Sequence, residues 1–185
     1  MDTKLYEGKL VRLAPMDPET DAKLMADWGR NSEYARLLDS DPAMLWTPKQ
    51  VEDWFVKGDE EMVHFMIHTL ADDRTIGMID LSGFNWSAGH CWVGIGLGEP
   101  EVWGKGYGSD AMNVLLRFAF RELNLNRVNL NVFDYNLRAI RSYEKVGFKY
   151  EGRCRQFMMR EGKRWDIVYM GILRREWEAL QPPGE

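Results

Sequence analysis

Three glycines in alternate positions, Gly104, Gly106 and Gly108, most constrain how this chain folds. Because glycine has no Cβ, several backbone N–H groups of such a turn can converge on one anion. The residues that follow predict an amphipathic helix running to Glu122, whose first amides are unpaired and whose dipole is positive at that end. The stretch therefore predicts a phosphate-binding turn at the start of a helix, with an ordinary turn-rich helix entry as the alternative.

The spacing of these glycines differs from two well-known phosphate-binding motifs. In a Walker loop the Gly-Lys pair precedes Ser or Thr, whereas here Lys105 is followed by Gly106. In a dinucleotide fingerprint the third glycine would fall at position 109, where the chain has Ser109. The turn alone therefore leaves its anionic ligand unidentified.

The size and composition of the chain indicate one domain of 185 residues around one core. Its two cysteines, Cys91 and Cys154, lie far apart and it has three histidines, so we expect neither a disulfide framework nor a metal site. A net charge of −5 argues against nucleic acid as the main partner and suits a cationic substrate. Because the sequence has no apolar run near the roughly 20 residues that span a bilayer, and no hydrophobic signal segment, we expect a cytoplasmic protein without a membrane partner.

The pattern of apolar residues predicts strands and helices in alternation. Period-two alternation predicts strands over 9–14, 62–70, 75–84, 90–98, 127–133, 148–159 and 164–173. Helical spacing and capping residues predict helices over 17–29, 33–38, 47–58 and 136–147, besides the helix after the glycine turn. The strands on either side of that turn and its helix form a βαβ crossover, so we expect them to be parallel neighbours with a ligand at their carboxyl ends.

The strand before the turn has an unusual face. Val93, Ile95 and Leu97 point one way, whereas glycines at positions 94, 96 and 98 point the other way. Glycine weakens a strand, so three on one face indicate either that something approaches the backbone closely or that the strand is kinked or bulged.

Two motifs in this arrangement make the chain resemble the GNAT superfamily of acyl-CoA-dependent N-acetyltransferases over nearly its whole length. The first motif is GEPEVWGKGYG at 98–108, and the second is NLRAIRSYEKVGF at 136–148. Within the superfamily, the sequence around Trp103 and the closing GILRREW resemble the ribosomal-protein alanine N-acetyltransferases and their polyamine-acetylating neighbours. The family pattern usually has Gln or Arg where this chain has Trp103, a replacement that looks common in that branch.

The resemblance implies a mixed α/β fold with a twisted, mostly antiparallel sheet of about seven strands, a splayed parallel pair at its centre, and four to five flanking helices. It implies one domain over residues 1–185, in which we expect about 178–185 to form a disordered tail. The implied reaction is direct transfer of an acetyl group from acetyl-CoA to a primary amine, without a metal. The amine would belong to a protein N-terminus, such as that of a ribosomal protein, or to a small amine or polyamine. A CoA-binding regulatory module without catalysis is the alternative.

The resemblance also places acetyl-CoA on particular residues. Amides from Gly104 to Ser109 would hold the pyrophosphate, Lys105 would add positive charge or be a solvated lysine, and Asn136 would contact the cofactor arm, cap its helix, or do both. The pantetheine arm would pair with the strand backbone and enter the gap between the parallel strands. The expected cofactor-binding residues are Ile95, Leu97, Trp103, Gly104, Lys105, Gly106, Tyr107, Gly108, Ser109, Asn136 and Tyr143.

Attack of an amine on a thioester needs a neutral amine, a stabilised oxyanion and a proton for the leaving thiolate. By resemblance, Tyr143 faces the CoA sulfur as the general acid, with a packing role as the alternative. Glu99, Glu101 and Asp134 are candidate carboxylate bases, as is Asp80 on the preceding strand, although carboxylates of this kind are usually only solvated.

The segment over 33–46 is expected to line the acceptor site. Its acidic residues Glu33, Asp39 and Asp41 would hold a cationic amine or serve as ordinary surface and capping groups. The three histidines lie in predicted strands and are expected to be packing or surface groups. A homodimer formed through the terminal hairpin and an exposed sheet edge is a further expectation.

Overall fold

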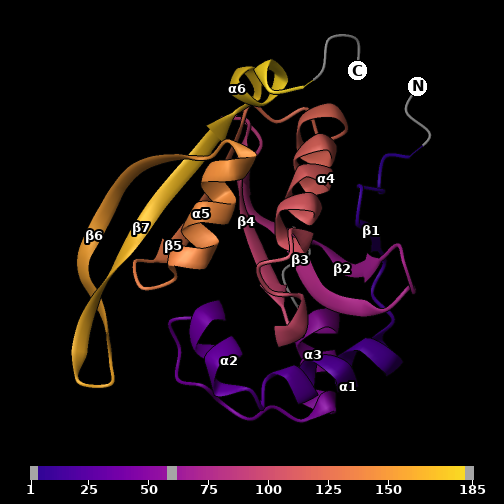
Figure 1. Ribbon diagram of the computed structural model, residues 1–185, viewed down its shortest axis with the longest axis vertical. Helices are drawn as coiled ribbons and strands as arrows, with labels where there is room; N and C mark the ends of the chain where they lie inside the picture. The colour runs from indigo at the N-terminus through magenta and orange to yellow at the C-terminus, as the bar shows by residue number, and fades with distance from the viewer. Residues whose placement is uncertain (1–3, 58–61, 182–185) are drawn as a thin grey trace.

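A mixed sheet forms the centre of the structure, a computed structural model that describes residues 4–57 and 62–181 (Figure 1). Its seven strands follow the order β1-β2-β3-β4-β5-β7-β6, and every neighbouring pair is antiparallel except β4 and β5. The strands are β1 (Val11–Ala14), β2 (Val63–Thr69), β3 (Thr75–Asn85), β4 (His90–Leu97), β5 (Arg127–Phe133), β6 (Lys149–Arg160) and β7 (Lys163–Leu173). The predicted fold class and the seven predicted strands are therefore confirmed.

Six α-helices accompany the sheet among the described residues, one more than the four to five expected. They are α1 (Pro18–Trp28), α2 (Ser32–Leu38), α3 (Pro48–Lys57), α4 (Tyr107–Arg121), α5 (Leu137–Val146) and α6 (Arg174–Ala179), and a short 3-10 helix, η1, covers Pro100–Val102. The prediction missed α6 because six residues are too few to show helical periodicity. The end predicted for the third helix, Gly58, lies outside the described residues. None of the helices described is long and apolar enough to cross a membrane.

The disordered tail expected for 178–185 is wrong for its first residues. Glu178 belongs to α6, and the N–H of Gln181 donates to the carbonyl oxygen of Glu178 at 3.1 Å. The buried ring of Trp177 holds this helix, packing against Phe120 at a centroid distance of 5.3 Å. The last four residues lie outside the described part of the chain.

The helices α4 and α5 cover one face of the sheet and bury the main core with it (Figure 1). Alternate residues of the central strands point toward these helices, because side chains of a strand alternate between the two faces. Burial of each large apolar side chain contributes about 1.5–3 kcal/mol, so this layer fixes α4 and α5 on the sheet. Its fully buried side chains include Ile67, Ile79, Leu81, Leu115, Leu116, Phe120, Leu130 and Ile172.

The glycine face of β4 receives side chains from α1 and α2. A Cβ at Gly98 would collide with the ring of Trp28, and a Cβ at Gly96 would lie 2.9 Å from the hydroxyl oxygen of Tyr34. The predicted close approach to this face is therefore confirmed, and the approaching groups are side chains of the chain itself. Over residues 92–97, β4 keeps its register with β3 without a shift, so no bulge interrupts this part of the strand.

Side-chain caps start the two helices that supply these aromatic rings. The Asp17 carboxylate accepts the N–H of Glu19 at 3.1 Å, and the Asn31 side chain accepts the N–H of Glu33 at 3.0 Å. Such caps are worth about 1 kcal/mol each, and they satisfy amides that the helix itself leaves unpaired.

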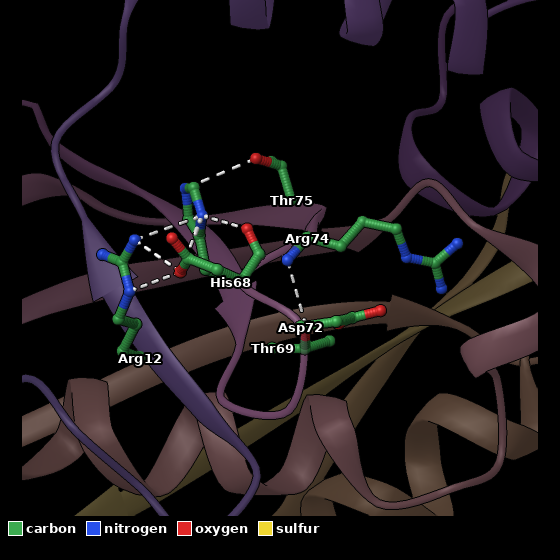
Figure 2. A network of polar contacts seen from close by, with 7 residues as sticks. Arg12, His68, Thr69, Asp72, Arg74 and Thr75 are labelled. Atoms are coloured by element: carbon green, nitrogen blue, oxygen red, sulfur yellow. Dashed lines mark hydrogen bonds and ion pairs between the residues drawn. The ribbon is translucent and has the colours of Figure 1, made fainter.

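A polar network holds the turn between β2 and β3 (Figure 2). The hydroxyl of Thr69 donates to the carboxylate of Asp72 and accepts the N–H of Arg74 at 3.2 Å. From β1, Nη2 of Arg12 lies 2.7 Å from Oδ1 of Asp73 in the same turn. The network therefore ties β1 to this turn.

The parallel strands β4 and β5 pair over only their first halves. The register joins residues 90–92 to residues 127–129 and ends there. Beyond that point each strand stays paired only on its outer side, β4 with β3 and β5 with β7. The carboxyl-terminal halves of the two strands therefore diverge, as the predicted splayed pair requires.

The packing of Trp28 on the glycine face predicts that Gly98→Ala destabilises the protein. The added methyl group forces the Trp28 ring out of its place, so we expect the free energy of unfolding to fall by about 1–3 kcal/mol. Denaturant unfolding measures this change. The matched control is Gly152→Ala in β6, where a Cβ meets nothing within 4 Å and a change below about 1 kcal/mol is expected. Equal effects of the two substitutions would contradict the packing described for β4.

Candidate functional site

The glycine turn enters α4 through two residues with left-handed backbone. Gly104 has a φ of +73°, and Gly106, the N-cap of α4, has a φ of +93°. Because Gly106 lacks a side chain, no side chain caps this helix, and the first-turn amides of Tyr107, Gly108 and Ser109 have no acceptor within the helix. The start of α4 therefore keeps the donors and the positive dipole end that an anion site uses.

Asp110 fixes the start of α4 against the segment that leads into β1. Its carboxylate accepts three backbone N–H groups, from Lys9 at 3.1 Å, Leu10 at 2.7 Å and Val11 at 3.0 Å. Gly8 packs so closely on this carboxylate that a Cβ there would collide with it. The sequence analysis missed this contact, since an acidic residue in a first helical turn is ordinary and its partners lie about 100 residues away.

The first turn of α4 lies against the diverging half of β4. A Cβ at Gly108 would lie 3.5 Å from Cδ1 of Leu97 and 3.9 Å from Cδ1 of Ile95. The structure thus places the candidate anion site directly beside the two strand residues that were expected to line the cofactor path.

Trp103, which stands where the family pattern has Gln or Arg, joins three parts of this site. Its Nε1–H donates to the carbonyl oxygen of Leu97 at 2.8 Å. The guanidinium carbon of Arg138 lies 4.1 Å from the centroid of the Trp103 ring, a cation–π contact. Trp103 therefore links the end of β4, the glycine turn and α5. The neighbouring Lys105 is exposed.

The helix α5 begins beside the same turn. Asn136 caps it, because Oδ1 of Asn136 accepts the N–H of Ala139 at 3.2 Å, and the Nδ2 group lies outside the cap. The hydroxyl oxygens of Ser109 and Ser142 are 2.8 Å apart, which joins the first turn of α4 to α5. The capping role expected for Asn136 is therefore confirmed.

Tyr143, the residue after Ser142, packs against the main core, with its ring centroid 6.1 Å from that of Phe148. Burial raises the pKa of Tyr143 to about 12, so the phenol is protonated at neutral pH. The packing role is thus confirmed, and it leaves Tyr143 in the protonation state of a proton donor.

Asp80 is a buried carboxylate on the glycine face of the sheet. It is 8% exposed and lies on β3 opposite Gly94 of β4. A Cβ at Gly94 would lie 2.6 Å from Oδ2 of Asp80, so the glycine leaves room for the carboxylate. Burial raises the pKa of Asp80 to about 6, against the lowering effect of a hydrogen bond with Ser82. Such a carboxylate is ionised at neutral pH and more basic than a solvated one.

The other candidate bases have different surroundings. Glu101 is exposed, and its Oε1 lies 2.7 Å from Nη1 of Arg74. Oε1 of Glu99 accepts the Nε1–H of Trp28 at 2.8 Å, so this carboxylate helps to hold Trp28 on the glycine face. Asp134 follows the end of β5, and its N–H donates to the carbonyl oxygen of Asp166 at 3.1 Å. Oδ1 of Asp134 is buried and makes no hydrogen bond within the described residues.

The segment between α2 and α3 is exposed over its whole length. Every side chain from 38 to 50 is exposed, including the acidic Asp39 and Asp41 and the apolar Leu45, which is 76% exposed. Glu33, in the first turn of α2, is exposed as well. These acidic and apolar groups are therefore accessible to a ligand.

The histidines have packing and polar roles. The ring of His64 lies 4.8 Å from that of Phe55, and His68 belongs to the network of the β2–β3 turn (Figure 2). Within residues 4–57 and 62–181, no three His, Cys, Asp or Glu side chains lie close enough together to share a metal ion.

The sequence analysis did not predict Trp28, Tyr34 or Asn129 as residues that shape this site. Asn129 is 7% exposed, and its Nδ2 donates to the carbonyl oxygen of Cys91 at 2.9 Å, where β4 and β5 stop pairing. A polar residue within a buried strand was the available signal for Asn129, since buried amides need partners. Trp28 and Tyr34 carried no local signal, because the glycines they cover lie more than 60 residues away.

Comparisons with known proteins agree with this geometry. The family described as "Acetyltransferase (GNAT) domain" matches residues 11–149. The chain belongs to this family. One GNAT relative, the "SPbeta prophage-derived uncharacterized N-acetyltransferase YokL" of Bacillus subtilis (strain 168), is 30% identical over 181 residues, which are 96% of this chain and 98% of the relative. The "Putative ribosomal N-acetyltransferase YdaF" of the same organism is 34% identical over 110 residues, 60% of each chain.

A solved GNAT structure has the same fold. The spermidine N-acetyltransferase from Vibrio cholerae, crystallised with CoA and spermine, aligns with a TM-score of 0.81 and 23% identity. The alignment covers 91% of this chain and 98% of that one. The protein is therefore an acetyltransferase with the GNAT fold, and its splayed β4–β5 pair and glycine turn belong to one GNAT domain.

The burial of Asp80 predicts that Asp80→Asn stabilises this GNAT domain at high pH. The pKa of Asp80 is 3.8 before burial and about 6 in the folded protein, so the folded state holds the proton more tightly than the unfolded state does. The free energy of unfolding of the wild type therefore decreases as the pH rises from about 4 to about 6. The substitution should therefore raise the free energy of unfolding by up to about 3 kcal/mol above pH 6, and the gain should vanish below about pH 4. Urea unfolding from pH 4 to 8 measures it. The exposed change Glu33→Gln is the control, and a gain for Asp80→Asn that does not vary with pH would contradict the burial effect.

Proposed function

We propose that this GNAT enzyme transfers the acetyl group of acetyl-CoA to a primary amine by direct attack in a ternary complex. The observation that carries the proposal is the contact of Gly108, in the uncapped first turn of α4, with Ile95 and Leu97 on the splayed half of β4. An anion site thus adjoins a strand edge without a partner strand. Acetyl-CoA has a pyrophosphate that suits the anion site, and an extended arm with amide groups that suits the unpaired strand edge.

The residues around this contact suit the two parts of the cosubstrate. In the proposal, the amides from Gly104 to Ser109 bind the pyrophosphate, with Lys105 and the Trp103–Arg138 pair beside them. The pantetheine arm pairs with the backbone near Ile95, and the Nδ2 group of Asn136 reaches the same arm. The carbonyl oxygen of Leu97 already accepts a hydrogen bond from Trp103, so at this end of β4 the arm has one backbone acceptor fewer to pair with.

The gap between β4 and β5 lets the two substrates meet from opposite faces of the sheet. Ile95 and Leu97 face α4, on the side proposed for acetyl-CoA. Asp80 and the glycines face α1 and α2, on the side proposed for the amine. Where the strands diverge, neither backbone closes the sheet, so an amine can reach a thioester that lies in the gap.

The proposed chemistry divides proton transfer between the two faces. The amine nitrogen attacks the thioester carbonyl carbon, the C–N bond forms, and the C–S bond breaks. Asp80, directly or through water, takes the proton that the amine loses, and Tyr143 gives its hydroxyl proton to the leaving thiolate. A backbone N–H of β4 in the gap would stabilise the oxyanion. Glu99 and Asp134 remain alternative bases, and Oδ1 of Asp134 makes no hydrogen bond to any described residue.

The cysteines favour direct attack over an acetyl-cysteine intermediate. Burial raises the pKa of Cys91 to about 12, and the charge of Asp80 acts in the same direction, so Cys91 is not a thiolate at neutral pH. Cys154 lies exposed on β6, at the edge of the sheet and away from the β4–β5 gap.

The acceptor is an amine presented to the exposed segment between α2 and α3. Its acidic residues Asp39 and Asp41, with Glu33 nearby, favour a cation such as a polyamine, the class named for the Vibrio cholerae structure. A protein N-terminus, the class suggested by the name of YdaF, would use the exposed apolar side chains of the same segment. One amine panel distinguishes the two.

The decisive assay incubates the protein with acetyl-CoA and a panel of spermidine, spermine and peptides with an N-terminal alanine, while free thiol is followed. Because Cys154 is exposed and Cys91 is buried, a Cys154→Ser background removes the accessible thiol of the chain itself. We expect amine-dependent thiol release and an acetylated amine of matching amount. Binding of acetyl-CoA without acceptor-dependent release would contradict the function proposed.

The same assay tests the two assigned proton carriers. Tyr143→Phe and Asp80→Asn should each lower kcat about a hundredfold or more, as loss of a general acid or base does. In the wild type, kcat should also decline as the pH falls through about 6, because Asp80 then takes up a proton and can no longer accept one. A wild-type kcat in either variant would contradict the role proposed for the substituted residue.

A further inference from the structure

The hairpin of β6 and β7 bends toward α2 through a bulge. Cys154 pairs with Ile167 and Met158 pairs with Trp165, so three residues of β6 lie opposite one residue of β7. The N–H of Gln156 in this bulge donates to Oδ1 of Asp166 at 2.8 Å, which fixes the distortion. A bulge bends its strand, and the tip of the hairpin extends well beyond the rest of the sheet, to the level of α2 (Figure 1).

The tip itself is a tight turn that presents Arg160. Glu161 and Gly162 have φ values of +52° and +73°, as in the two-residue turns that match the twist of a hairpin. Arg160 and Lys163 pair on either side of this turn. The Nε1–H of Trp165 donates to the carbonyl oxygen of Arg160 at 3.3 Å, and this hydrogen bond fixes the backbone of Arg160.

From this position, the guanidinium of Arg160 gathers the end of α2 and the segment after it. Nη1 donates to the carbonyl oxygen of Arg36 and, at 2.8 Å, to the hydroxyl of Tyr135. Nη2 donates to the carbonyl oxygens of Asp39 at 3.1 Å, Ser40 at 3.5 Å and Asp41 at 3.1 Å.

Two further contacts join the same parts of the chain. The hydroxyl of Tyr135 donates to the carbonyl oxygen of Arg36 at 2.6 Å. The side chain of Arg36 returns to the hairpin tip, with Nη1 lying 2.7 Å from Oε1 of Glu161. A cation at the carboxyl end of a helix also complements the helix dipole there.

These contacts matter because packing does not hold the segment. Every residue from 38 to 50 is exposed, so little buried apolar area fixes residues 39–41 in place. The carbonyl groups of these residues are instead held by one side chain from a strand about 120 residues later. Their position therefore depends on Arg160.

The end of α2 also connects to the strand at which transfer is proposed. A Cβ at Gly96 of β4 would lie 2.8 Å from Cδ1 of Leu38 and 2.9 Å from the hydroxyl oxygen of Tyr34. Arg160 thus holds the helix whose side chains cover the glycine face beside the β4–β5 gap. A change at the hairpin tip can reach the acceptor side of the site through α2.

We propose that Arg160 is a positioning residue for the amine acceptor: it holds residues 39–41 and the end of α2 in the arrangement that binds the amine. The proposal rests on the acetyl transfer proposed above. Without Arg160, the segment occupies its binding arrangement for a smaller fraction of the time, and the apparent affinity for the amine falls by that fraction. The acetyl-CoA side is built on α4 and α5, and the acceptors of these Arg160 hydrogen bonds lie on neither helix.

The test compares Arg160→Ala with the wild type and with Arg155→Ala, an exposed arginine on the same strand that makes no such contact within residues 4–57 and 62–181. With the best amine of the panel, we expect Arg160→Ala to raise KM for the amine about tenfold while KM for acetyl-CoA changes less than about twofold. Arg155→Ala should change neither the KM for the amine nor the KM for acetyl-CoA. Arg160→Lys keeps the charge but loses the fork of donors, so it should recover only part of the amine affinity.

Hydrogen exchange of the same variants separates positioning from general destabilisation. In Arg160→Ala, the amides of 37–46 should exchange faster while those of β4 and α4 keep their wild-type rates. An unchanged amine KM, equal rises of both KM values, or unchanged exchange over 37–46 would each overturn the proposal. A wild-type protein that releases no thiol with any amine would instead contradict the proposed function, and that result is visible before any variant is made.

Discussion

The divergence of β4 and β5 is the constraint on which the rest of the site depends. A sheet normally closes itself with backbone hydrogen bonds, and here the parallel register ends after residues 92 and 129. Antiparallel partners hold each strand from outside, and the Asn129 side chain bonds to the carbonyl of Cys91 at the point of separation. The fold can therefore keep a gap between β4 and β5 without loss of the backbone hydrogen bonds to β3 and β7. The two faces of the sheet that are candidates for binding the substrates meet at that gap.

Each face of the gap is built by a different mechanism. On one face, α4 and α5 rest on a continuous apolar core, and Asp110 fixes the start of α4 through three backbone hydrogen bonds. On the other face, aromatic rings of α1 and α2 lie on glycines, and polar contacts from the hairpin tip hold the exposed segment after α2. Packing gives the side proposed for the cosubstrate a rigid frame, whereas the side proposed for the acceptor relies on hydrogen bonds that sequence change can alter one at a time.

Much of the fold could be predicted, as could the helix start proposed for the cosubstrate side, because their signals are local. Alternation gave the strands, and the glycines with the helix after them predicted the start of α4. The acceptor side could not be predicted, since its contacts join distant residues: Trp28 covers Gly98, and Arg160 bonds to residues 39–41. No periodicity or spacing encodes which side chain fills the space over a glycine, and the groups that approach these glycines are the protein's own tryptophan and tyrosine.

Hydrogen exchange with and without CoA tests the central claim most directly, since it reports where the cosubstrate contacts the backbone. Saturating CoA should slow exchange of the amides at 104–109 and over the carboxyl-terminal half of β4, residues 93–97. The hairpin tip at 160–163 should keep its rates. Binding of CoA, established by calorimetry, with no protection at either the glycine turn or β4 would contradict a cosubstrate site in the β4–β5 gap.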